Sequence, residues 1–120
     1  MDADATLLVA CLCAQWCGVC RDWRPAFDAI AAQRPEARFA WIDIEDMADM
    51  LGGYEPDDFP VLAVQRGRDL VYCATVPQQP GVWLRLIEYL AALEAEAAAQ
   101  RAAQLARTGP RLPDLRELTA

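Results

Sequence analysis

Trp16-Cys17-Gly18-Val19-Cys20 stands between an apolar segment, residues 6–13, and a segment with helical spacing, residues 21–33. Two cysteines at this spacing, where a strand leads into a helix, are typical of a redox dithiol. Cys17 falls at the predicted helix N-terminus, where unpaired N–H groups and the positive end of the helix dipole favour a thiolate. Cys20 follows one helical turn later, close enough to resolve a mixed disulfide formed at Cys17. The stretch therefore predicts a dithiol active site.

The segments on either side predict an α/β domain. Residues 6–13 form an apolar run that is typical of a buried strand, and Trp23, Phe27 and Ile30 lie on one face of the helix that follows. The remaining elements are expected in this order: a strand at 38–45, a short helix at 46–51 capped by Asp46, strands at 61–65 and 70–76 joined by a hairpin, and a long helix at about 80–107. Because a strand–helix–strand unit pairs in parallel and a hairpin pairs antiparallel, we expect a mixed four-stranded sheet with helices on both faces.

The 120 residues fit one domain, at residues 1–109, followed by a tail at 110–120 with spaced leucines and no firm assignment. From Glu94 onward the long helix is rich in Ala, Glu, Gln and Arg and has little to bury. We therefore expect that half to project from the domain or to pack on a partner, which includes self-association with a second copy.

Charge and composition exclude several classes of function. A net charge of −7 argues against binding to nucleic acid or to anionic membrane surfaces. The chain has no His, Lys, Ser or Asn, which excludes Ser–His and Cys–His catalysis, a Schiff-base lysine and a histidine-based zinc site. No nucleotide-binding signature is present, so we expect no cofactor. The acidic start of the chain does not resemble an export signal, which predicts a cytoplasmic protein.

The order of elements, the Trp-Cys-x-x-Cys motif, Pro25 and Phe59-Pro60 together resemble the thioredoxin family over about residues 5–95. The chain looks like the core of that fold without the family's first strand and helix. The resemblance implies that Cys17 is the exposed nucleophile, that Cys20 is the buried resolving thiol and that the Phe59–Pro60 bond is cis. It also implies protein substrates with disulfides or thiols, and a separate reductase or a small thiol as electron donor. The implied substrate-binding residues are Trp16, Gly18, Val19, Phe59 and Pro60.

Four positions depart from the family pattern. Val19 replaces the proline that thioredoxins carry between the cysteines. The family's buried aspartate aligns with Cys11, its neighbouring lysine with Trp41, and the aromatic beside the disulfide with Cys13. The usual proton relay to the resolving cysteine is therefore missing, which predicts a thiol–disulfide oxidoreductase of low turnover.

The other cysteines admit further interpretations. Cys11 and Cys13 point to the same face of their strand and are expected to be small buried hydrophobic residues, as is Cys73. An alternative joins Cys11, Cys13, Cys17 and Cys20 as four thiolates around zinc or an iron–sulfur cluster, but the rigid strand disfavours it, so no metal is expected. A second function is also open, in which the fold is a protein-binding module and the thiols are vestigial or regulatory.

Overall fold

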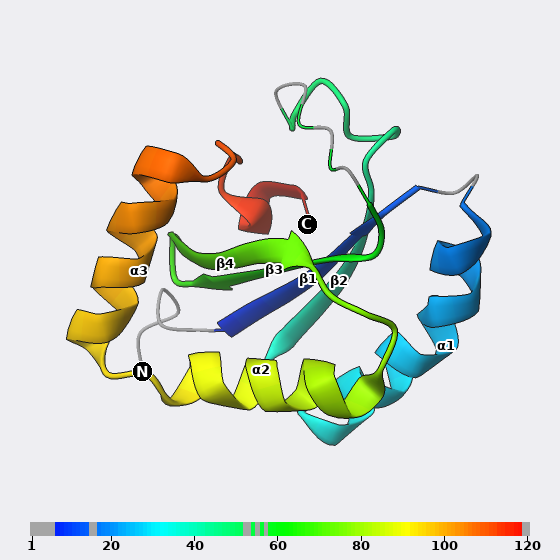
Figure 1. The fold of residues 1–120 in the computed structure, drawn as a ribbon, viewed down its shortest axis with the longest axis horizontal. Helices are drawn as coiled ribbons and strands as arrows, with labels where there is room; N and C mark the ends of the chain where they lie inside the picture. Colours follow the sequence, from blue (N-terminus) through cyan, green and yellow to red (C-terminus); the bar gives the residue numbers. More distant parts are fainter. Residues whose placement is uncertain (1–6, 15–16, 52–53, 55, 57, 119–120) are drawn as a thin grey trace.

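The protein is built around a four-stranded mixed sheet (Figure 1). The structure is a computed structural model that describes residues 7–14, 17–51, 54, 56 and 58–118. The strands are β1 (Leu7–Cys13), β2 (Arg38–Asp43), β3 (Val61–Arg66) and β4 (Asp69–Thr75). Their spatial order is β2-β1-β3-β4, with β1 parallel to β2 and antiparallel to β3, and with β3 antiparallel to β4. The predicted α/β class and mixed sheet are confirmed.

The central strand β1 is buried on both faces, which explains its unbroken apolar sequence. Because side chains alternate along a strand, Val9, Cys11 and Cys13 belong to one hydrophobic cluster. The intervening residues, which include Leu8 and Leu12, belong to a second cluster on the opposite face. The odd-numbered side chains of β1, with Leu7 at the margin of this cluster, therefore lie on the face that receives the helices.

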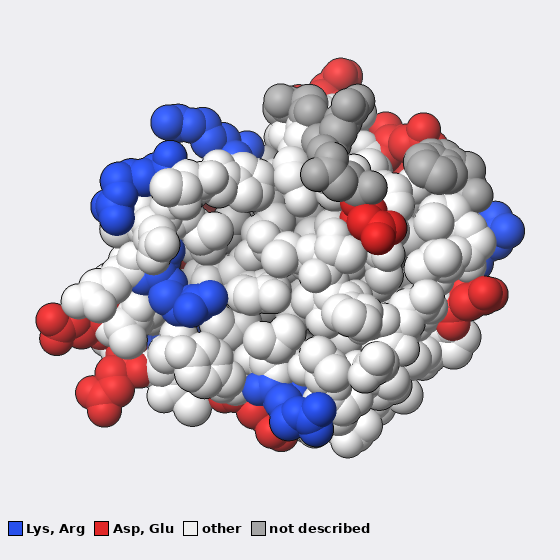
Figure 2. Space-filling view, viewed as in Figure 1, with Lys and Arg blue, Asp and Glu red and all other residues white. Residues whose placement is uncertain are grey.

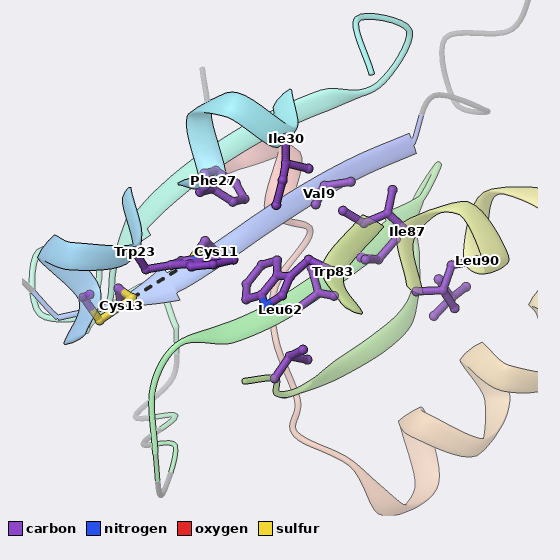
Figure 3. Packing of buried hydrophobic residues seen from close by; sticks show 14 of the residues in the cluster. Val9, Cys11, Cys13, Trp23, Phe27, Ile30, Leu62, Trp83, Ile87 and Leu90 are labelled. Carbon is purple, nitrogen blue, oxygen red and sulfur yellow. Dashed lines mark hydrogen bonds between the residues drawn. A yellow bond between two sulfur atoms is a disulfide. The ribbon is translucent and has the colours of Figure 1, made fainter. Parts of the chain in front are cut away.

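Helices α1 (Gly18–Gln33) and α2 (Pro80–Ala92) cover this first face. The predicted face of α1 is buried, and its residue Trp23 lies against Trp83 of α2, with ring centroids 4.9 Å apart (Figure 3). Phe27 makes an edge-on contact with the same Trp83 ring at 6.1 Å. Tilted and edge-on aromatic pairs of this kind add to the energy of area burial, so the aromatic cluster anchors both helices to the sheet.

No α-helix covers the second face among the described residues; consecutive turns at 44–51 and a short 3-10 helix, η2 (Leu115–Leu118), take that place. The short helix expected at 46–51 with Asp46 as its cap is therefore wrong. Instead, Asp43 Oδ1 accepts hydrogen bonds from the backbone N–H groups of Glu45, at 2.8 Å, and Asp46, at 3.3 Å. An aspartate that bonds backbone two and three residues ahead favours turns over a regular helix.

The single helix expected at about 80–107 is also wrong, because α2 ends at Ala92 and a second helix, α3 (Ala95–Thr108), follows. Arg66 explains the break: its Nη1 donates to the carbonyl oxygens of Leu90, at 3.2 Å, and Leu93, at 2.7 Å. A guanidinium that satisfies the last carbonyls of a helix stabilises its end.

Helix α3 does not project from the domain. It packs beside β4, where Arg101 Nε donates to the carbonyl oxygen of Val71 at 3.1 Å. Ala98 is buried in the same contact. Gly109 ends α3, and a Cβ at this position would meet the backbone oxygen of Leu105 at 3.0 Å, so only glycine fits without a shift.

The C-terminal tail is fastened to the sheet by Gln65, a polar side chain buried in β3. Gln65 Nε2 donates to the carbonyl oxygen of Gly67, at 2.7 Å, and to Asp114 Oδ1, at 2.6 Å, while its Oε1 accepts from the backbone N–H of Leu115 at 2.9 Å. All of its hydrogen-bonding atoms thus have partners, as burial requires. Leu115 and Leu118 then fill the second hydrophobic cluster. No helix in the described part of the chain has the length and apolar character needed to cross a membrane.

Candidate active site

Cys17 occupies the N-cap position of α1, as the sequence predicted. Its backbone is extended, with φ −86° and ψ 118°, and its N–H donates to the carbonyl oxygen of Ala14 at 3.0 Å. Its thiol is free and partly exposed. No side chain caps the first turn of α1, and that turn contains no acidic residue. The N-terminal N–H groups of the helix are therefore available to an anionic sulfur at this position.

Cys20, one turn further along α1, is buried and forms a disulfide with Cys13, the last residue of β1. The two Cα atoms lie 5.7 Å apart, within the usual range for a disulfide. The interpretation of Cys13 as a free buried thiol is therefore wrong. The role of Cys20 as the resolving partner of Cys17 stays a prediction.

Tertiary packing explains this pairing. Cys13 faces α1 because of strand alternation, and Cys20 faces β1 because it shares the inward side of α1 with Trp23 and Phe27. Figure 3 shows the bond between the end of the strand and the first turn of the helix. The sequence patterns predicted each orientation separately. Taken together, the two orientations would have predicted that Cys13 and Cys20 meet.

Cys11 lies directly behind this disulfide. Its Sγ is 3.8 Å from Cys13 Sγ, and because a disulfide sulfur carries no proton, Cys11 is the donor in this contact. Burial raises the pKa of the Cys11 thiol far above its usual value, and the positive charge of Arg24 only partly opposes that effect. Cys11 is therefore a neutral thiol at physiological pH and is not a proton acceptor.

A hollow of about 750 Å³ opens beside α1 and reaches Cys20. Its wall combines two arginines, Arg21 and Arg24, with carboxylates from α1, the end of β2 and the turns beyond it. The remaining lining residues include Trp41 and Met47. The hollow therefore brings charged side chains close to Cys20.

The predicted substrate-binding residues that the structure describes fall in two places. Gly18 and Val19 are exposed on the first turn of α1. The Phe59–Pro60 bond is cis, as the resemblance implied, and Phe59 packs against the cluster that holds the disulfide. Pro60 is buried, and its carbonyl oxygen accepts from the backbone N–H of Val76 at 3.2 Å. Trp16 lies outside the described residues.

A metal centre has no support in the geometry. Among the residues that the structure describes, no group of three or more Cys, Asp or Glu side chains is arranged to hold a metal ion. Two of the four thiols in the alternative cluster, Cys13 and Cys20, are bonded to each other.

Known proteins match both the sequence and the fold. The thioredoxin family profile matches residues 1–78. Thioredoxin H7 of Arabidopsis thaliana is 34% identical over 71 residues, which cover 58% of this chain and 55% of that protein. A thioredoxin of Echinococcus granulosus is 33% identical over 58 residues, which cover 48% of this chain and 54% of that protein.

Solved structures agree with these matches. A mutant thioredoxin from Halobacterium salinarum superposes with a TM-score of 0.65 at 25% identity, covering 77% of this chain and 80% of that one. Thioredoxin of Fasciola hepatica superposes with a TM-score of 0.58 at 25% identity, covering 71% and 81%. The chain spans about half the length of the curated relatives it matches. Because the family profile covers more than half of the sequence, the chain belongs to the thioredoxin family.

Proposed function

We propose that this protein is a thiol–disulfide oxidoreductase that acts on protein disulfides through Cys17 and Cys20. One observation carries the proposal: a free, partly exposed thiol at the N-cap of α1 lies one turn from a buried cysteine. The thiolate of Cys17 attacks a substrate disulfide, which forms a mixed disulfide and releases one substrate thiolate. Cys20, as a thiolate, then attacks Cys17 Sγ and releases the second substrate thiolate. The dithiol thereby transfers two electrons to the substrate.

The surface beside Cys17 suits a protein substrate. Gly18 and Val19 are exposed next to the nucleophile, and Phe59 and Pro60 precede β3. We propose, from the resemblance, that Phe59 offers its backbone to an extended substrate segment and that Trp16 shields the motif. Figure 2 shows that the face turned to the viewer has few charged side chains at its centre.

The electron donor in this proposal is a separate reductase or a small thiol, since the chain contains no nucleotide-binding signature. Three free cysteines, Cys11, Cys17 and Cys73, favour a reducing compartment such as the cytoplasm. Self-association through the outer side of α3 stays a prediction, to be tested by sedimentation of the purified chain.

The test is reduction of a disulfide-linked model protein with dithiothreitol as electron donor. We expect catalysis by the parent protein and none by Cys17→Ala. Cys73→Ala is the matched control, because Cys73 packs against the opposite face of the sheet, with its Sγ 3.7 Å from the Tyr54 hydroxyl. Full activity in Cys17→Ala would refute the proposal.

The Cys13–Cys20 bond favours one alternative, a protein-binding module with regulatory thiols. While Cys20 is bonded to Cys13, Cys17 has no free resolving thiol and would hold a partner as a lasting mixed disulfide. A single-turnover experiment without dithiothreitol separates the two functions. When one equivalent of substrate is mixed with the reduced protein, a binding module retains the substrate as a mixed disulfide at Cys17, whereas an oxidoreductase releases both substrate thiols.

A further inference from the structure

We propose that Cys13 is a third redox-active cysteine. It displaces Cys17 from a Cys17–Cys20 disulfide, so that the oxidised protein holds a Cys13–Cys20 disulfide inside the core. This inference rests on the proposed function and adds a residue to it. Cys20 would have two alternative partners: Cys17 towards the surface and Cys13 towards the sheet. The oxidised protein would then present Cys17 as a free thiol.

The places of the three cysteines in the fold support this exchange. Cys20 is bonded to Cys13, and Cys17 precedes Cys20 by three residues at the start of the same helix. Side chains three apart on a helix are neighbours, with Cβ atoms about 5–6 Å apart. Cys20 therefore lies between two cysteines, one on its own helix and one on β1.

Exposure differs sharply among the three cysteines. Cys13 and Cys20 are 0% and 1% exposed, whereas Cys17 is partly exposed. Thiol–disulfide exchange needs direct access of the attacking sulfur to the disulfide. Because Cys13 and Cys20 are almost fully buried, even beside the hollow, an external thiol has much poorer access to their bond than to Cys17, so Cys17 is the route by which electrons enter in this proposal.

The exchange balances without an added oxidant. Starting from a Cys17–Cys20 disulfide, the Cys13 thiol gives up its proton to solvent water, and its sulfur attacks Cys20 Sγ. The Cys13–Cys20 bond forms as the Cys17–Cys20 bond breaks, and Cys17 leaves as a thiolate. The number of disulfides is unchanged, and no electrons leave the protein.

Re-reduction uses the reverse step. Cys17 attacks Cys20, which re-forms the surface disulfide and returns a proton to Cys13. An external thiol then attacks Cys17 Sγ, giving a mixed disulfide and a free Cys20. A second external thiol attacks the sulfur of the first, which releases a small disulfide and restores the Cys17 thiolate. Two external thiols thus supply the two electrons.

Electrostatics favours the interior pair at equilibrium. Cys17 is partly exposed at the N-cap of α1, where no side chain occupies the N–H groups of the first turn, so these groups can donate to the sulfur as it leaves. A thiolate at Cys13 would be buried among hydrophobic side chains, where charge is disfavoured, whereas a disulfide there is neutral. The arrangement therefore places the bond in the core and the free sulfur of Cys17 at the surface.

Disulfide mapping of the oxidised parent protein is the first test. After alkylation and proteolysis at low pH, we expect Cys13 and Cys20 in one linked peptide pair and an alkylated Cys17. A Cys17–Cys20 linkage as the sole product would overturn the proposal. This measurement needs no variant, so it does not depend on the folding of a mutant.

The second test is kinetic. Reduced glutathione is added to three oxidised proteins: the parent, Cys17→Ala and the control Cys73→Ala. Samples are quenched by alkylation, and their masses are measured by mass spectrometry. We expect the Cys13–Cys20 bond of Cys17→Ala to be reduced at least about tenfold more slowly than in the parent or the control, since reduction then needs local opening. The difference should vanish in denaturant. Equal rates in the native state would overturn the proposal.

These outcomes are separable from failure of the proposed function. If the oxidoreductase proposal is wrong, the parent protein will show no substrate turnover. The internal exchange would still be visible as the Cys13–Cys20 linkage and its dependence on Cys17. Conversely, if the parent protein turns over substrate but shows only a Cys17–Cys20 linkage, the oxidoreductase proposal stands and the proposed role of Cys13 is refuted.

Discussion

Cys11 of β1 lies directly opposite Trp41 of β2 in the parallel register. The guanidinium of Arg24 lies over the Trp41 ring, 5.0 Å from its centroid, and its charge also acts on Cys11. The resemblance to the thioredoxin family places that family's buried aspartate at Cys11 and its lysine at Trp41. These two neighbouring positions therefore carry neither the carboxylate nor the amine of that relay.

This relationship predicts that Cys20 resolves a mixed disulfide slowly at neutral pH and faster in alkali. Burial raises the pKa of Cys11, so its thiol is protonated at pH 7 and accepts no proton from Cys20. Cys11→Asp should accelerate resolution near pH 7, by up to about 10² to 10⁴ if general-base assistance is fully restored. The measurement is single-turnover release of product from the Cys17 mixed disulfide against pH.

Cys11→Ser is the matched control, because it changes the side chain to a similar size without adding a carboxylate. It should leave the pH profile of resolution unchanged. An unaltered rate in a folded Cys11→Asp protein would show that another group serves as base; Asp43 and Asp46, which line the hollow beside Cys20, would then be the next candidates.

Cys17 should be the faster of the two motif thiols to react in the reduced protein. It is partly exposed at the start of α1, whereas Cys20 is buried beneath it. Iodoacetamide labelling across pH 5 to 9, read by peptide mass spectrometry, measures both rates. Cys20→Ala should also accumulate a mixed disulfide at Cys17 when it meets an oxidised protein substrate. Equal labelling rates at all pH values would contradict this assignment.

Gln65 should be required for stability because it fastens the tail to β3. Gln65→Leu removes two donated hydrogen bonds and leaves the N–H of Leu115 without its acceptor. We expect the free energy of unfolding to fall by about 1–3 kcal/mol, the usual cost of an unsatisfied buried group. Chemical denaturation measures the change, and the exposed Gln78→Ala serves as control. A change below about 0.5 kcal/mol would show that the tail is not held in this way.

Asp114 should make the stability depend on acid pH. Hydrogen bonds from Arg116, foremost, and from Gln65 hold the pKa of its carboxyl well below the ordinary value of 3.8. A carboxylate whose pKa is depressed on folding stabilises the native state above its unfolded pKa, and this contribution is lost as pH falls towards the folded pKa.

The free energy of unfolding of the parent should therefore fall more steeply below about pH 4 than that of Asp114→Asn. Denaturant titrations between pH 7 and pH 2 measure both curves. Parallel curves over this range would mean that the hydrogen bonds to the Asp114 carboxylate do not stabilise the folded state relative to the unfolded state.

Local sequence was sufficient for most of the framework. The apolar run of β1 requires burial on both faces, the spacing of Trp23, Phe27 and Ile30 directs one side of α1 to the sheet, and the cysteine motif falls at the junction between them. Each of these features depends on backbone periodicity and on residues close in the chain, which is why pattern reasoning recovered them. The hairpin between β3 and β4 follows from Gly67, whose φ of 62° glycine adopts without strain.

Tertiary structure alone decided which distant groups meet. Arg66 ends α2 through carbonyl oxygens more than 20 residues away, at a point where helix propensity favours continuation. Gln65 holds the tail against a face of the sheet for which the sequence analysis predicted a covering helix. Cys13 bonds to Cys20 because strand alternation and helix rotation direct both sulfurs into the same space. The sequence by itself determined where the four strands and α1 form, whereas the break between α2 and α3 and the choice of partner for Cys20 depended on how those elements pack.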